Sequence, residues 1–70
     1  MSIVKISIIA ATLNSANTLE FLIKSVIPHI SSKVEFIIID GKSSDGTVEI
    51  IKKYSNFLSY WETVAGQWYI

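Results

Sequence analysis

Two aspartates, Asp40 and Asp45, are the residues whose type and spacing could best carry chemistry. Asp40 directly follows the apolar run from Phe36 to Ile39, and a short polar loop with glycines leads from it to Asp45. A carboxylate at the end of a buried parallel strand lies at the sheet edge where open α/β folds bind ligands. Such a group can accept a hydrogen bond from a base N–H or a ribose hydroxyl. A second polar loop, with Asn14, follows the first apolar run and would face it.

Ordinary turn chemistry is an alternative explanation for these residues. Asp-Gly pairs are common in turns, and Asp45 is explained adequately as the N-cap of a following helix. Asn14 could equally be a turn residue. On spacing alone, turn chemistry is the better explanation of Asp40 as well.

The sequence does not contain the residues that several other kinds of chemistry require. The sequence has neither the G-x-x-x-x-G-K-[ST] phosphate loop nor a G-x-G-x-x-G dinucleotide fingerprint. Ser15, Ser43 and Ser44 have no nucleophile-elbow context, so nucleophilic catalysis is not supported. With no cysteine and a single histidine, His29, the chain offers no thiolate or paired-imidazole site. We therefore assign no catalytic residue and no metal ligand.

The elements that would position the two loops follow from hydrophobic periodicity. Residues 3–11, 34–39 and 57–62 are rich in β-branched and aromatic residues and predict strands. A helix is predicted from about Thr18, with Asn17 as N-cap and Glu20 completing a capping box. Pro28 should end or kink it. A second helix is predicted over residues 46–54, capped by Asp45.

The order β-α-β-α-β with short connections predicts an α/β fold with a parallel sheet, right-handed crossovers and three layers. We take residues 1–70 as one partial domain. The first strand is continuously apolar from Ile8 to Ala11, so we expect it to be buried on both faces. Its outer edge would be open and very apolar, which predicts pairing with another copy of the chain or aggregation.

Composition excludes some functions and partners. Six basic and six acidic residues give no net charge and no basic face, so nucleic acid is not expected as a partner. No apolar stretch is long enough to span a bilayer. The absence of cysteine fits a reducing compartment, and we expect a cytoplasmic protein.

Taken together, the motifs resemble the N-terminal part of a family 2 glycosyltransferase with the GT-A fold, which is Rossmann-like, and bacterial polysaccharide-assembly members above all. The resemblance covers about residues 3–62. The segments that carry it are Ser7 to Asn14, Asn17 to Leu19, Ile23 to Val26, and Ile38 to Thr47. The last resembles the family's D-[DG]-G-S-T-D-G-T loop.

The resemblance implies a nucleotide-sugar donor, commonly a UDP-sugar. Thr12 to Asn14 would line the nucleoside pocket, Asp40 would contact the uracil, and Asp45 would be a structural N-cap. The nucleotide-binding residues implied in this way are Thr12, Leu13, Asn14, Asp40, Gly41, Lys42 and Ser43.

The chain also departs from the family pattern. Lys42 stands where glycine is usual, and the segment from Glu62 to Ile70 has Val64 where the family has an aspartate. The D-x-D motif, which holds Mg²⁺ or Mn²⁺ in complete members, and the carboxylate base are both absent. We therefore expect an N-terminal fragment that binds nucleotide-sugar for transfer to a polysaccharide or glycan acceptor, and that is inactive alone.

Two alternatives remain at this stage. The first is a non-catalytic small α/β module that self-associates through its open strand edge. The second is a piece of a receiver or flavodoxin-like domain, which also places acids at strand ends but lacks a Thr-Leu-Asn partner loop.

Overall fold

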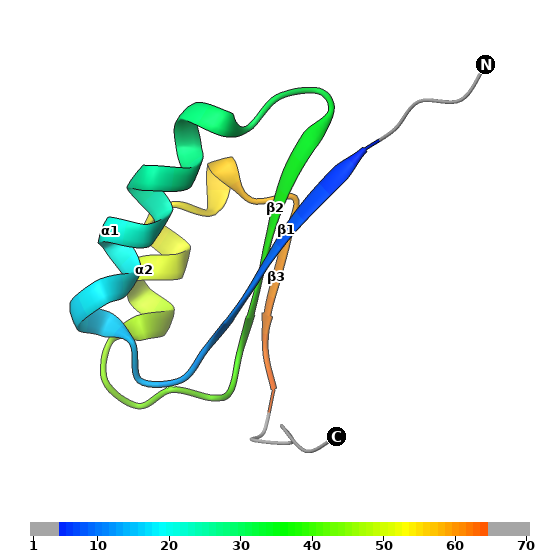
Figure 1. The fold of residues 1–70 in the computed structure, drawn as a ribbon. Helices are drawn as coiled ribbons and strands as arrows, with labels where there is room; N and C mark the ends of the chain where they lie inside the picture. Colours follow the sequence, from blue (N-terminus) through cyan, green and yellow to red (C-terminus); the bar gives the residue numbers. More distant parts are fainter. Residues whose placement is uncertain (1–4, 65–70) are drawn as a thin grey trace.

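A computed structural model describes residues 5–64 of the chain (Figure 1). Three strands alternate with two α-helices, and a short 3₁₀ turn follows each helix. The elements are β1 (Ile6–Thr12), α1 (Ala16–Val26), η1 (Ile27–His29), β2 (Val34–Asp40), α2 (Thr47–Lys53), η2 (Ser55–Phe57) and β3 (Tyr60–Thr63). The predicted α/β class and β-α-β-α-β order are confirmed.

The sheet has the order β1-β2-β3, and both strand pairs are parallel. Both helices cover the same face of this sheet (Figure 1). The strand order advances in one direction, so two crossovers of the same hand place both helices on one side. The described residues therefore form two layers. The prediction of three layers is wrong for this part of the chain, because neither helix covers the other face of the sheet.

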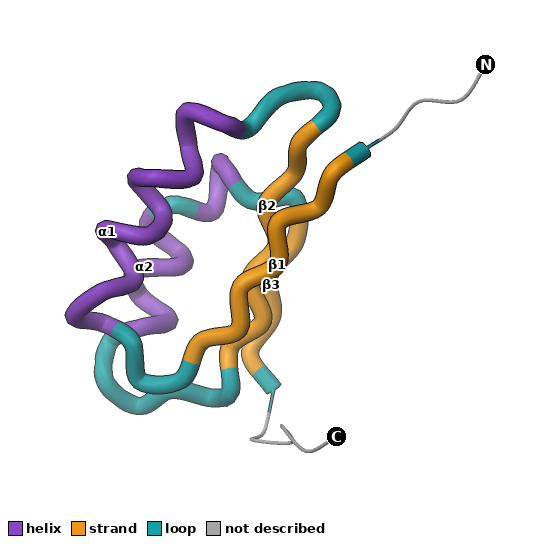
Figure 2. Tube along the Cα trace, in the orientation of Figure 1, coloured by secondary structure: helices purple, strands orange, loops and turns teal. Residues whose placement is uncertain are grey.

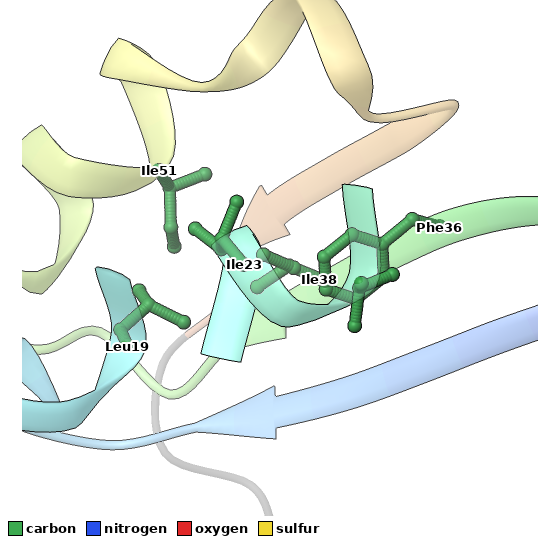
Figure 3. Packing of buried hydrophobic residues seen from close by; sticks show 6 residues of the cluster. Leu19, Ile23, Phe36, Ile38 and Ile51 are labelled. Atoms are coloured by element: carbon green, nitrogen blue, oxygen red, sulfur yellow. The ribbon is translucent and has the colours of Figure 1, made fainter. Parts of the chain in front are cut away.

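The core lies between the sheet and the two helices. Alternate residues of β2, Phe36 and Ile38, point toward the helices because side chains alternate along a strand. They pack with Leu19 and Ile23 of α1 and Ile51 of α2 (Figure 3). All five are essentially inaccessible to solvent, so the fold has one contiguous hydrophobic core.

The opposite face of the sheet is uncovered among residues 5–64. Ile9 of β1 keeps 66% of its surface exposed, and Ile37 and Ile39 of β2 are only half-buried. The expectation that the first strand is buried on both faces is therefore wrong for the described residues. Its physical reason is the one-sided placement of the helices, which leaves nothing to pack on the odd-numbered side chains of β1.

The first helix starts earlier than predicted. It begins at Ala16 with Ser15 in the N-cap position, so Asn17 lies inside the first turn and the predicted capping box does not form. Glu20 instead points to α2, where its carboxylate accepts hydrogen bonds from Tyr54 and from Lys53 at 3.0 Å. The end of the helix is as predicted, since α1 stops at Val26 and Pro28 lies in the 3₁₀ turn that follows.

The third strand starts later than predicted. Ser55–Phe57 form a 3₁₀ turn, and pairing with β2 begins only at Tyr60. The turn uses local hydrogen bonds, among them one from the N–H of Phe57 to the carbonyl of Tyr54 at 3.0 Å. Most of the Glu62 to Ile70 segment considered above lies outside the described residues.

Candidate functional site

Two loops meet at the carboxyl ends of β1 and β2. The parallel register places Thr12 beside Asp40, the last residues of the two strands. The N–H of Gly41 donates to the carbonyl of Thr12 at 2.8 Å and extends the ladder by one bond. The loops that follow run side by side before entering α1 and α2 (Figure 2). The sequence prediction that these loops face each other is confirmed.

The Asp40 carboxylate is the centre of the site. Its Oδ1 accepts hydrogen bonds from the Thr12 and Ser43 hydroxyls, both at 2.6 Å. Its Oδ2 accepts from the Ser43 N–H at 2.8 Å and from the Thr63 hydroxyl at 3.0 Å. The side chain is fully buried. Every acceptor position of the carboxylate is therefore occupied by a donor from the chain itself.

These donors keep Asp40 ionised. Burial on its own raises the pKa of a carboxyl group, because a low dielectric disfavours the charged form. The hydrogen bonds from Ser43, Thr12 and Thr63 outweigh burial, and the pKa of Asp40 is lowered from its ordinary value. The negative charge thus persists inside the fold, at the point where all three strands end.

Asn14 and Ser43 lock the two loops together. The N–H of Asn14 donates to the Ser43 hydroxyl at 2.8 Å, and the N–H of Ser44 donates to the Asn14 side-chain oxygen at 2.9 Å. Asn14 has a φ of 48°, in the left-handed region that asparagine tolerates better than most residues. The Ser43 hydroxyl accepts from Asn14 and donates to Asp40, so it links the first loop to the buried carboxylate.

Asp45 joins the starts of the two helices. Its carboxylate accepts hydrogen bonds from the N–H and hydroxyl of Thr47, at the start of α2, and from the N–H of Ala16 at 3.1 Å, at the start of α1. The pKa of Asp45 is lowered, chiefly by the hydrogen bond from Thr47. The Thr47 hydroxyl in turn accepts from the N–H of Ser15 at 2.8 Å. The prediction of Asp45 as the N-cap of α2 is wrong by one residue, because α2 begins at Thr47 with Gly46 in the N-cap position. From one residue further out, the Asp45 carboxylate accepts from the first N–H of each helix.

Lys42 occupies a backbone conformation that favours glycine. Its φ is 61°, and its side chain is exposed. Left-handed backbone costs a residue with a Cβ roughly 1–2 kcal/mol. The usual family glycine at this position therefore has a conformational reason, and the loop keeps its shape with lysine at that cost.

The structure brings most of the predicted residues into one network and leaves two on its surface. Thr12, Asn14, Asp40, Gly41 and Ser43 are hydrogen-bonded to one another. Leu13 and Lys42 project to solvent, with Leu13 56% exposed. Sequence reasoning missed Thr63, which lies beside Asp40 in the β2–β3 register. The strand prediction ended at residue 62, and a strand running one residue further would have placed Thr63 there.

The described residues do not fit a divalent metal. In residues 5–64, no three carboxylate, imidazole or thiolate side chains gather closely enough to hold an ion. Asp40 and Asp45 are each engaged by donors from the chain. The same part of the chain contains no helix both long and apolar enough to cross a membrane.

In α/β domains that bind nucleotides, the ligand typically contacts the loops at the carboxyl ends of neighbouring parallel strands. The model of the family described as Glycosyl transferase family 2 matches residues 7–64, and the chain belongs to this family. The chain is also 41% identical over 56 residues to a cholesterol galactosyltransferase of Borreliella burgdorferi. That match covers 80% of this chain but 16% of the relative, so the chain spans only a small part of that protein's length. No solved structure matches the chain.

Proposed function

We propose that this chain forms the nucleotide-binding portion of a glycosyltransferase and that its ligand is a nucleotide-sugar, of the UDP-sugar class. The observation that carries the proposal is the bonded pair of loops at the ends of β1 and β2, joined through Asn14 and Ser43. Ligands of open α/β sheets bind outside the carboxyl ends of the strands. Membership of the glycosyltransferase family supplies the class of ligand.

The uracil contact of Asp40 requires an exchange of hydrogen bonds. All four acceptor positions of the carboxylate are filled, so a base N–H must displace one of the present donors. The Thr63 hydroxyl makes the longest of the four bonds, at 3.0 Å, and belongs to an exposed residue. The imide N–H of uracil would take its place, because it offers the donor that an ionised carboxylate accepts.

Replacement of the Thr63 hydroxyl by a base N–H predicts that the site prefers uracil to cytosine. Uracil carries a proton on N3, whereas cytosine has a lone pair at the same position. In the same pose cytosine would direct its N3 lone pair at the negative carboxylate, which is costly for a buried charge, and its 4-amino group could donate only after a shift of the base. We expect UDP to bind and CDP to bind at least tenfold more weakly.

This chain binds the nucleotide-sugar and, on its own, does not transfer the sugar. In a complete enzyme an acceptor hydroxyl displaces the nucleoside diphosphate at the anomeric carbon, with a carboxylate as base. Residues 5–64 contain no cluster that fits Mg²⁺ or Mn²⁺. The acceptor class is a polysaccharide or glycan, and the relative's name adds a sterol as a second class. The lack of cysteine supports a cytoplasmic location.

Calorimetric titration of the 70-residue chain with UDP and CDP tests the ligand. Lys42→Ala removes the exposed cation of the second loop, and Lys33→Ala is the matched control at the opposite end of β2. We expect Lys42→Ala to weaken UDP binding several-fold and Lys33→Ala to leave it unchanged. Absence of heat at millimolar UDP would refute nucleotide binding, and equal affinity for CDP would refute the Asp40 contact.

A transfer assay tests the inactivity of the chain alone. The purified chain is incubated with radiolabelled UDP-sugar, Mn²⁺ and glycan or sterol acceptors, and labelled product is counted. We expect none above the buffer control. Turnover by the 70 residues would show that the base and the leaving-group stabilisation lie within them.

The alternative function is a non-catalytic module that self-associates through β1. The exposed Ile9 on that strand favours it. Because β1 pairing and nucleotide binding use different parts of the sheet, the loss of one does not require the loss of the other.

A further inference from the structure

The donors that fill the Asp40 carboxylate differ in what their displacement would cost. Among residues 5–64 these donors belong to Thr12, Ser43 and Thr63. Thr12 is 4% exposed, so its hydroxyl, once displaced, would be left in the core without an acceptor. Ser43 gives the carboxylate two bonds, and its hydroxyl also accepts from the N–H of Asn14. Displacement of Ser43 would therefore separate the two loops.

Thr63 can give up its bond without either cost. It is the last residue of β3, its side chain is exposed, and its hydroxyl makes a single bond to Oδ2 of Asp40 at 3.0 Å. The backbone beside it is held separately, because the N–H of Val64 donates to the carbonyl of Asp40 at 2.7 Å. A change of the Thr63 χ1 rotamer moves the hydroxyl into solvent and leaves the pairing of β2 with β3 intact. Oδ2 therefore has one exchangeable position, and Oδ1 has none.

We propose that Thr63 is a specificity-determining residue, because its hydroxyl occupies the single acceptor position of Asp40 that a nucleobase can reach. This inference rests on the proposed nucleotide binding and extends it to the bases that the site excludes. In the ligand-free fold the Thr63 hydroxyl satisfies Oδ2, and in the complex a base N–H does so. Thr63 thus stabilises the empty site and weakens binding of the ligand by competing with it.

A single exchangeable position selects against guanine. Guanine presents two donors side by side, the N1–H and the 2-amino group, whereas the uracil N3–H stands alone between two carbonyl groups. A guanine placed against Asp40 would direct its second donor at Oδ1, where the hydroxyls of Thr12 and Ser43 already donate. One of these two costly bonds would have to break. We therefore expect GDP to bind at least about tenfold more weakly than UDP, since a buried donor would lose its acceptor.

Thr63→Val tests the competition, because valine has the shape of threonine without the hydroxyl. Isothermal titration calorimetry measures the UDP affinity of the 70-residue chain. We expect Thr63→Val to bind UDP about three- to tenfold more tightly, the range that one net hydrogen bond supports. Thr63→Ser keeps the hydroxyl and should bind UDP as the natural chain does. Far-UV circular dichroism checks folding, and Thr63→Ala removes the same hydroxyl if the valine variant is unfolded.

Two matched variants make the same chemical change elsewhere. Thr12→Val removes the buried donor to Asp40, and we expect it to lower stability without tightening UDP binding. Thr18→Val removes the hydroxyl of an exposed threonine on α1 that bonds the carbonyl of Ser15, and we expect no change in UDP affinity. Tighter binding by Thr12→Val than by Thr63→Val would mean that the wrong donor has been assigned.

Urea unfolding of the ligand-free proteins distinguishes competition from a purely structural role. The Thr63 bond exists only in the ligand-free fold, so its loss should raise the unfolding constant by the same factor by which it raises the UDP association constant. The two factors should agree within about twofold, the usual tolerance of additivity. A purely structural role would lower stability and leave the affinity unchanged or weaker.

The titrations separate failure of this inference from failure of nucleotide binding itself. If the natural chain binds UDP and Thr63→Val binds it no more tightly, the role of Thr63 is overturned while the proposed function stands. Equal affinity of the natural chain for GDP and UDP would overturn the selection against guanine. Absence of UDP binding by the natural chain and by every variant would overturn the proposed function, and this inference with it.

Discussion

Replacing Asp40 by alanine should destabilise the fold more than any other substitution in the two loops at the carboxyl ends of β1 and β2. The substitution leaves the Ser43 N–H and the buried Thr12 hydroxyl without an acceptor. A stranded buried donor costs roughly 1–3 kcal/mol, so the two together cost about 4 kcal/mol. A chain of this length has a total unfolding free energy of roughly 4–10 kcal/mol. Asp40→Ala should therefore be partly unfolded in water.

Asp40→Asn is the matched control because it keeps the size of the side chain and one acceptor oxygen. The hydroxyls of Thr12, Ser43 and Thr63 can rotate to accept from the new amide, and the charge is the main loss. We expect this variant to lose about 1–2 kcal/mol, in line with the difference between charged and neutral hydrogen bonds.

Urea unfolding followed by circular dichroism measures both free energies at pH 7. The reasoning predicts the order natural chain, then Asp40→Asn, then Asp40→Ala, with the larger step between the two variants. An Asp40→Ala free energy within 1 kcal/mol of the natural chain would refute the view that the carboxylate holds the strand ends together. The outcome does not depend on whether a nucleotide binds.

Four further results are expected. Because the folded pKa of Asp40 is lowered, its stabilisation is complete above the unfolded value of about 3.9 and is lost as pH falls through the folded value; acid unfolding should therefore be less steep below about pH 4 in Asp40→Asn. Lys42→Gly should raise the unfolding free energy by about 0.5–1 kcal/mol, since relief of the left-handed backbone exceeds the added entropy of the unfolded chain; an unchanged urea midpoint would count against the strain. Asp45→Ala should speed hydrogen exchange at the Ala16 and Thr47 amides together, whereas an effect on one alone would contradict its double contact. Ile51→Ala should lower stability by about 2–5 kcal/mol in thermal melts, because its side chain is fully buried between the helices and the sheet.

Local patterns were sufficient to predict the elements and their order. Continuous apolar runs marked β1 and β2, and Pro28 marked the end of α1, because these signals depend on a few neighbouring residues. The start of α1 was predicted too late. The N–H of Ala16 finds its acceptor on Asp45, and a cap supplied from 29 residues away leaves no local signature.

The sequence predicted where the candidate site lies, but not that the Asp40 carboxylate is already fully hydrogen-bonded. The strand-end rule placed Asp40 beside Thr12 correctly. It could not reveal that four donors fill the carboxylate, because two of them come from Thr12 and Thr63 on other strands. The face of the sheet that each helix covers likewise depends on strand order, which no local pattern encodes.

The Asp40 bonds connect segments that lie far apart in the sequence. Thr12 precedes Asp40 by 28 residues and Thr63 follows it by 23, so the carboxylate ties together both β-α-β crossover units. The first unit contributes the bonds from Thr12 and Ser43. The second unit contributes the bond from Thr63 on β3. The Thr63 bond therefore joins the second crossover unit to the first through one buried carboxylate.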